Sequence, residues 1–189
     1  MPVPQSSRLT LASSLVCRAA LAYATFVHAQ VAPPADAPEA LRVPAGEKLL
    51  FRAHASGAQI YVCGRTADGK PQWTLKAPDA VLRGAKGALI GHHSAGPSWK
   101  LNDGSEVTGK AVARADSPDP GSIPWLLLAA VSHSGKGQLE RVTSIQRLHT
   151  RGGRPPPDSR CDPATKQNKE ARVPYRADYY FYGPVENGQ

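Results

Sequence analysis

The stretch "YRADYYFY", residues 175–182, alternates between two kinds of side chain. Successive side chains of a β-strand point to opposite faces, so an alternating pattern predicts a strand with two unlike faces. The first face is apolar and aromatic, and we expect it to lie in a core; it comprises Tyr175, Ala177, Tyr179 and Phe181. The second is mixed and could bind a ligand; it comprises Arg176, Asp178, Tyr180 and Tyr182.

A second stretch, "PWLLLAAVSH" at residues 124–133, is apolar at both sets of alternate positions. This pattern is typical of a central strand that is covered on both faces.

Asp68-Gly69 and Asp103-Gly104 are tight-turn signals between neighbouring predicted strands. Nine short strands are predicted, at residues 47–55, 58–64, 72–77, 87–93, 98–101, 106–115, 124–134, 140–150 and 174–183. They predict an all-β, single-domain β-sandwich, with a β-barrel as the alternative.

The chain is expected to divide into four parts around this domain. Residues 1–29 resemble a signal peptide, being mostly apolar or small and ending in Val27-His28-Ala29, with a disordered or helical extension as the alternative. Residues 30–40 are rich in Pro and Ala and predict an extended tether. The domain occupies residues 41–183, with a long loop over residues 152–169 and a C-terminal tail at residues 184–189.

The cysteine content agrees with an exported protein, in the periplasm or outside the cell. Removal of the signal peptide takes Cys17 away and leaves Cys63 and Cys161, which we expect to form a disulfide; two free buried thiols are the alternative. Neither residue has the spacing of a zinc site. No segment is suited to span a membrane.

The formal net charge of the whole chain is +8. Its Lys and Arg residues are scattered, which favours an ordinary charged surface over nucleic-acid binding. A cell-wall polymer or glycan is the partner that an exported basic protein could meet, and we expect a monomer.

Six motifs, in order, carry a family resemblance. They are "GAQIYVC", "WTLKAPDAVL", "GHHSAGPSWKLNDGS", "IPWLLLAAV", "VTSIQRLHTRGG" and "VPYRADYYFYG". Together they resemble domain-of-unknown-function family 3455, a group of exported bacterial and fungal proteins, over about residues 41–182. The resemblance implies a small, secreted, β-rich domain and brings no catalytic residues. Some fungal members are labelled malate dehydrogenase, but the sequence lacks the G-x-G-x-x-G spacing of a nicotinamide enzyme.

A metal site is one hypothesis for the histidines. His92 and His93 are neighbours on a strand, so only one of them can join a given site, and His93 lies beside the Gly96-Pro97 corner. Its available partners are His54, His133 and His149. Three such ligands with an open position would suit copper or zinc in a secreted metal-dependent enzyme. A hydrogen-bonded structural histidine is the competing interpretation.

The preferred hypothesis is a ligand-binding or surface-interaction protein that catalyses no reaction and requires no cofactor. Motifs of serine hydrolases and zinc proteases are absent from the sequence. Aromatic groups with a few polar partners are typical of binding sites in exported β-proteins. The candidates are His93, Trp99, Asp103, Tyr61, Tyr180 and Asp178. For Trp99 the alternative is a core position, and for Asp103 a turn-capping role.

Overall fold

The protein is an all-β domain, seen here in a computed structural model that describes residue 1, residues 32–162 and residues 170–185. The predicted signal peptide, apart from Met1, and residues 186–189 of the predicted tail lie outside the described residues. No described segment forms a helix with the length and hydrophobicity needed to cross a bilayer. The strands are β1 (Glu47–Arg65), β2 (Pro71–Arg83), β3 (Leu89–Ser94), β4 (Ser98–Leu101), β5 (Glu106–Ala115), β6 (Trp125–Ser134), β7 (Ser144–Gly152) and β8 (Glu170–Pro184).

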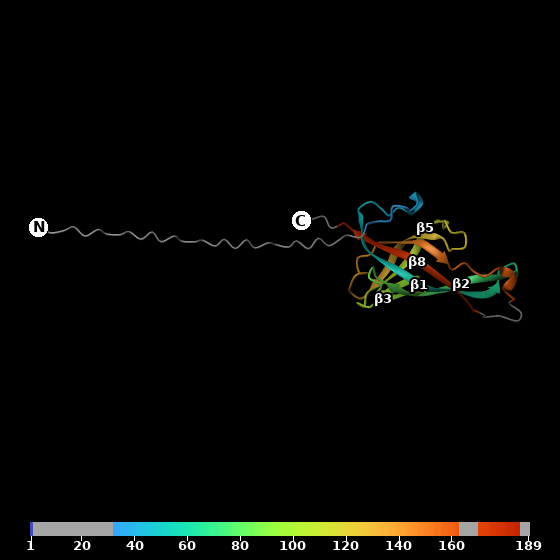
Figure 1. The fold of residues 1–189 in the computed structure, drawn as a ribbon. Helices are drawn as coiled ribbons and strands as arrows, with labels where there is room; N and C mark the ends of the chain where they lie inside the picture. Colours follow the sequence, from blue (N-terminus) through green and yellow to red (C-terminus); the bar gives the residue numbers. More distant parts are fainter. Residues whose placement is uncertain (2–31, 163–169, 186–189) are drawn as a thin grey trace. The chain divides into compact units, whose positions relative to one another are not determined.

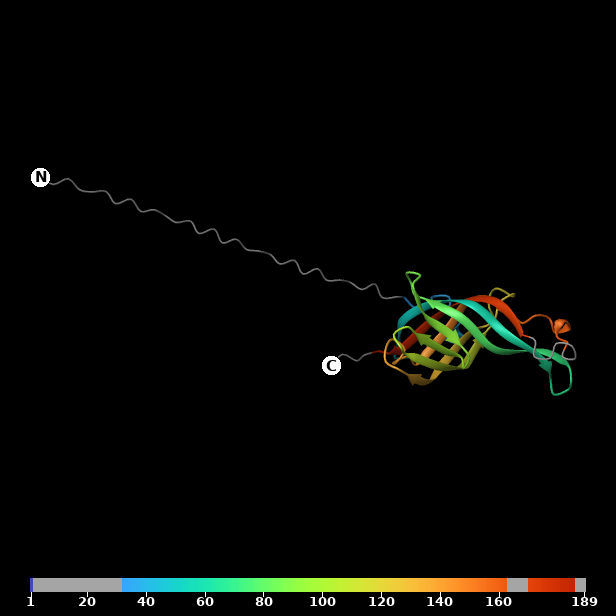
Figure 2. The ribbon, with the colours of Figure 1, turned by 90° about the horizontal axis from the view of Figure 1, so that it is seen from below.

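The eight strands form one antiparallel sheet that closes on itself. Each strand pairs with the next along the chain, and β8 pairs with β1 from Glu47↔Pro184 to Val62↔Glu170. The all-β class is therefore confirmed. The closed ring corresponds to the predicted alternative, a β-barrel, because the pairing of β1 with β8 joins all the strands in one sheet (Figure 2).

The strand count differs from the predicted nine because two predicted strands are the two halves of β1. The sequence predicts a break between two strands at Ser56-Gly57, but β1 continues through both residues. A Cβ atom at Gly57 would lie 2.1 Å from the carbonyl oxygen of Asp79 on β2. The glycine is thus required by the close approach of two strands, and no turn occurs there.

The barrel interior combines small residues on one side with aromatic rings on the other. Ala53 and Ala55 on β1 and Ala80 on β2 leave space that Trp99 and Phe181 occupy. The predicted inner face of β8 is confirmed, since Tyr175, Ala177, Tyr179 and Phe181 are all buried.

A second apolar cluster lies outside the barrel, under the short 3-10 helix η1 (Glu39–Leu41). Leu41 is fully buried there, and its carbonyl oxygen accepts a hydrogen bond from Nε2 of Gln146 on β7. Ala37 also packs against this cluster, so part of the segment predicted as a tether contacts the barrel (Figure 1). The cluster comprises Leu41, Trp125, Leu127, Leu148, Tyr180 and Tyr182.

This arrangement confirms the two covered faces of β6 only for its first half. Trp125 and Leu127 face the outer cluster, and Leu128 faces the interior. Val131, also predicted to be covered, is 59% exposed because η1 does not extend over this end of the strand.

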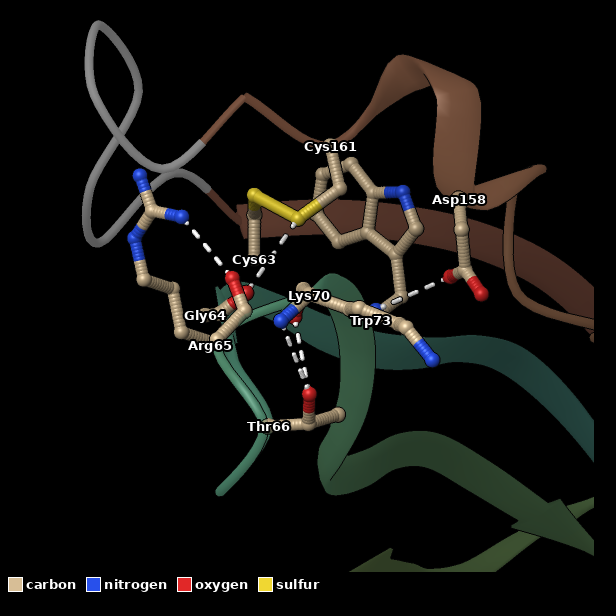
Figure 3. The surroundings of a disulfide bond; sticks show 9 residues. Cys63, Gly64, Arg65, Thr66, Lys70, Trp73, Asp158 and Cys161 are labelled. Atoms are coloured by element: carbon tan, nitrogen blue, oxygen red, sulfur yellow. Dashed lines mark hydrogen bonds between the residues drawn. A yellow bond between two sulfur atoms is a disulfide. The ribbon is translucent and has the colours of Figure 1, made fainter.

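The third cluster lies at the end of the β1–β2 hairpin, where the start of β8 and the 3-10 helix η2 (Asp158–Arg160) also lie (Figure 1). Cys63 and Cys161 form the predicted disulfide in this cluster, which joins residues 98 positions apart. Figure 3 shows the bond beside Trp73, whose backbone N–H donates to Asp158.

Both predicted turns at Asp-Gly pairs are present, with positive φ at Gly69 and Gly104.

Replacing Gly57 by alanine should lower the free energy of unfolding by about 2 kcal/mol or more, because the added methyl group overpacks the crossing of β1 and β2. Gly64→Ala is the matched control, since no atom lies within 4 Å of a Cβ added at that position of the same strand. Urea denaturation of both variants measures the difference. Equal stability of the two would contradict this account of Gly57.

Replacing both Cys63 and Cys161 by serine should lower the free energy of unfolding by about 3–5 kcal/mol, since the bond closes a long loop in the unfolded chain. Urea denaturation of the oxidised protein and the double variant tests this. The reduced wild-type protein should behave as the variant does. A loss below about 1 kcal/mol would show that the cross-link adds little to the fold.

Candidate functional site

The barrel contains a pocket of about 370 Å³ near the turn that joins β3 to β4. Its walls come from the inner faces of several strands, and Leu75 and Ala111 are exposed lining residues. The lining residues are Gln59, Leu75, Lys76, Ala77, Pro78, His93, Gly96, Pro97, Trp99, Ala111, Leu126, Leu128, Arg147 and Tyr179.

The stack of His93 on Trp99 forms the aromatic part of this pocket. The β3–β4 hairpin places the two residues opposite each other in register, and their ring centroids are 4.5 Å apart with nearly parallel planes. Tyr179 of β8 meets both rings edge-on. A Cβ at Gly109 would lie 3.1 Å from the Trp99 ring, so glycine at this position accommodates the indole.

His93 is a neutral imidazole of defined tautomer. Its Nδ1 lies 2.7 Å from the carbonyl oxygen of Ser98, so this nitrogen carries the proton and donates it. The Nε2 atom is then the acceptor of the ring. Burial lowers the pKa of His93 to about 3, because the charged form would lose its hydration. His93 therefore stays neutral near pH 7 and can accept a hydrogen bond there.

The other polar groups of the pocket are donors. Nε2 of Gln59 and Nε1 of Trp99 are buried and have no acceptor among the described residues. Arg147 is half-buried, donates from Nε and Nη2 to the carbonyl oxygen of Pro124, and forms no ion pair within the described part of the chain. Burial raises the pKa of the Tyr179 hydroxyl, which keeps that group protonated.

Of the predicted binding residues, the structure brings together His93 and Trp99. Tyr61 lies in the disulfide cluster and donates from its hydroxyl to the carbonyl oxygen of Gly153. Tyr180 and Asp178 lie on the outer face of β8.

Asp103 has the turn-capping role that was its alternative interpretation. Its carboxylate accepts hydrogen bonds from the backbone N–H groups of Ser105 and Gln138. The Gln138 N–H, together with the hydroxyl and N–H of Ser105, holds the pKa of Asp103 below its usual value.

The four histidines proposed as metal ligands do not converge on one site. His93 lines the barrel pocket, and His133 donates from Nε2 to the carbonyl oxygen of Val142. His54 and His149 flank Asp178 on the outer face and donate to it from Nδ1. The part of the chain that the structure describes holds no group of three or more His, Cys, Asp or Glu side chains suited to a metal ion.

Sequence reasoning missed Arg147 and Gln59 as pocket residues. Arg147 was counted among scattered surface charges, but it occupies the same face of β7 as Ile145, which is fully buried. The signal that could have identified it is a charged residue at an alternate position of an apolar face. Gln59 is a polar residue in a run of mostly small and apolar residues of β1, and full burial of such a side chain is uncommon.

Lowering the pH below about 6.5 should destabilise the fold through His93. The histidine of the unfolded chain takes up a proton near pH 6.5, whereas the buried ring resists protonation down to about pH 3. The contribution of His93 to the free energy of unfolding should thus fall by about 1.4 kcal/mol per pH unit between pH 6 and pH 4. Urea denaturation over this range should show wild type and His93→Gln converging at low pH.

His92→Gln is the matched control for this measurement. His92 is the neighbouring residue on β3 and is exposed to solvent. Its replacement should leave the pH dependence of stability as in the wild type. Parallel curves for wild type and His93→Gln would contradict the assignment of His93 as a buried neutral base.

Comparison of the chain with models of known protein families gives a match. The family described as "Protein of unknown function (DUF3455)" matches residues 44–183, which span all eight strands apart from the last residue of β8. Searches of curated proteins and of solved structures find no match. The match covers most of the chain, and the protein belongs to domain-of-unknown-function family 3455.

Proposed function

We propose that this protein binds a small amphipathic carboxylate inside the barrel. The observation that carries the proposal is a set of buried donors without acceptors around an otherwise apolar pocket. Buried polar groups are nearly always hydrogen-bonded in folded proteins, so the donors of Gln59 and Trp99 call for an acceptor.

The size and lining of the pocket support a small ligand. A closed barrel of eight strands is wide enough to hold one such molecule, and ligand pockets commonly have volumes of about 300–1,000 Å³. The pocket of about 370 Å³ is at the lower end of this range. Leu126, Leu128 and Pro78 supply apolar contacts, and the His93–Trp99 stack supplies an aromatic one.

The positive charge of Arg147 in the pocket supports an acidic ligand. The guanidinium group of Arg147 is half-buried without a carboxylate partner among the described residues, and its two hydrogen bonds to Pro124 recover only part of the lost hydration. A ligand carboxylate would recover it through charge-assisted hydrogen bonds with the three N–H donors of Arg147 that Pro124 does not use. The Nε2 atom of His93 would accept a hydrogen bond from a hydroxyl or amino group of the same ligand.

Stacking of a glycan on exposed aromatic rings has less support. Six Tyr and Trp residues of the described chain are between 0% and 8% exposed, and so none of their rings offers an open face; they are Tyr61, Trp73, Trp99, Trp125, Tyr180 and Tyr182. The binding proposal therefore concerns the interior of the barrel.

Export of the protein is part of the proposal. The disulfide between Cys63 and Cys161 supports an oxidising compartment, the periplasm or the exterior of the cell, because such bonds are rare in reducing compartments. The signal-like residues 1–29 support the same location.

The acid 1-naphthoate and the neutral 1-naphthalenemethanol form a pair of probes for the pocket. Titration of each, followed by tryptophan fluorescence and calorimetry, should show saturable 1:1 binding with the acid bound more tightly. Arg147→Gln should weaken naphthoate binding about tenfold and change naphthalenemethanol binding little, since only the acid pairs with the guanidinium.

Two further variants make the outcome decisive. Ala111→Phe places a ring at an exposed lining position and should abolish the binding of both probes. Arg114→Gln removes an equal charge from an exposed position of β5 outside the pocket and should bind both probes as the wild type does. Equal binding of naphthoate by wild type, Arg147→Gln and Ala111→Phe would overturn the proposal.

A further inference from the structure

A second cavity, of about 270 Å³, lies on the outer face of the barrel where β1, β2, β7 and β8 meet. It is separate from the barrel pocket, with which it shares no lining residue. Its lining is unusually rich in nitrogen-containing side chains, and comprises His54, Ala55, Ser56, Arg83, His149, Arg151, Arg176, Ala177 and Asp178.

The strand register explains why these side chains meet. His54 is opposite Arg83 on β2 and opposite Asp178 on β8, so all three lie on the outer face. Two residues further along, Arg176 of β8 is opposite Arg151 of β7. Like charges at directly opposite positions of a sheet are destabilising, and a negative charge between the two arginines would relieve the repulsion.

Asp178 does not neutralise these arginines. One of its carboxylate oxygens lies 2.5 Å from Nδ1 of His54 and the other lies 2.9 Å from Nδ1 of His149. Its side chain is 17% exposed, and both oxygens are engaged by imidazole N–H groups. The aspartate therefore fixes the orientation of the two rings.

The arginines keep most of their donors available. Arg176 is exposed and makes no ion pair or side-chain hydrogen bond with any described residue. Arg151 approaches Asp119 only at 3.8 Å, and Arg83 donates from Nη1 to the carbonyl oxygen of Gly87. The lining itself contains three guanidinium groups and one carboxylate, an excess of two positive charges, and Asp119 pairs with Arg151 from outside the lining.

We propose that this outer cavity binds a phosphate dianion, either free or as a phosphate monoester. Two excess charges match a dianion, and planar guanidinium groups bind tetrahedral oxyanions through paired hydrogen bonds. Nε2 of His149 lies 2.9 Å from Asp36, while that of His54 faces no partner among the described residues.

Titration with inorganic phosphate at constant ionic strength tests the site, by calorimetry and by NMR of the histidine side chains. Phosphate should bind with 1:1 stoichiometry and shift the ring resonances of His54 and His149, while those of the exposed His92 on β3 stay in place. Arg176→Gln should weaken phosphate binding about tenfold. Arg114→Gln, which removes the same charge from β5, should change it by less than about twofold.

Two esters distinguish the forms of the ligand. Glucose 6-phosphate, a dianionic monoester, should bind at least as tightly as inorganic phosphate, and dimethyl phosphate, a monoanionic diester, should bind more weakly. Equal affinity for dimethyl phosphate would overturn the assignment of a dianion. Equal phosphate affinity of wild type and Arg176→Gln would overturn the site itself.

The test is independent of the barrel pocket. Arg147→Gln should bind phosphate as the wild type does, and Arg176→Gln should bind 1-naphthoate as the wild type does. Loss of phosphate binding in Arg147→Gln would contradict the separation of the two sites.

Discussion

The pairing of β1 with β8 is the interaction on which the rest of this structure depends. It joins the first strand to the last over almost their whole lengths, and it leaves the sheet without an open edge between them. Once the ring is closed, every strand has an interior and an exterior face. Small residues on β1 and β2 then leave room inside for the aromatic side chains of β4 and β8, and the space that these do not fill is the barrel pocket.

β8 contributes to both proposed sites because its faces alternate. Tyr179 points to the interior and meets the His93–Trp99 stack, while the preceding residue, Asp178, points outward and orients His54 and His149. Neighbouring residues thus serve chemically different environments, one apolar and one densely charged. Tyr180, the next outward residue, is covered by the segment that contains Leu41, so the exposed part of this face runs from Asp178 and Arg176 toward the start of β8.

The sequence was sufficient for the local features of the fold. Period-two alternation correctly identified the inner face of β8, and the limits of β4 and β5 matched because a Gly-Pro corner precedes β4 and an Asp-Gly turn separates the two strands. Closure of the ring was only an alternative, since alternation specifies faces but does not specify which distant strand is the partner. The predicted break at Gly57 was wrong because, in the sequence, a glycine required by a close strand crossing looks the same as a glycine required by a turn. Arg147 was missed because its burial depends on the space beside Trp99, which only the closed barrel creates.

The disulfide has a consequence for the order in which the chain can fold. Val62, adjacent to Cys63, is the partner of Glu170 at the start of β8, and Glu170 follows Cys161 by only nine residues in the sequence. In the reduced chain, these partners must meet across more than 100 residues. In the oxidised chain the cross-link reduces this search to a short loop, whose closure costs less conformational entropy. The bond thereby holds the start of β8 near the last part of β1. The pairing of these two strands, which is otherwise a slow long-range contact, then becomes a local one.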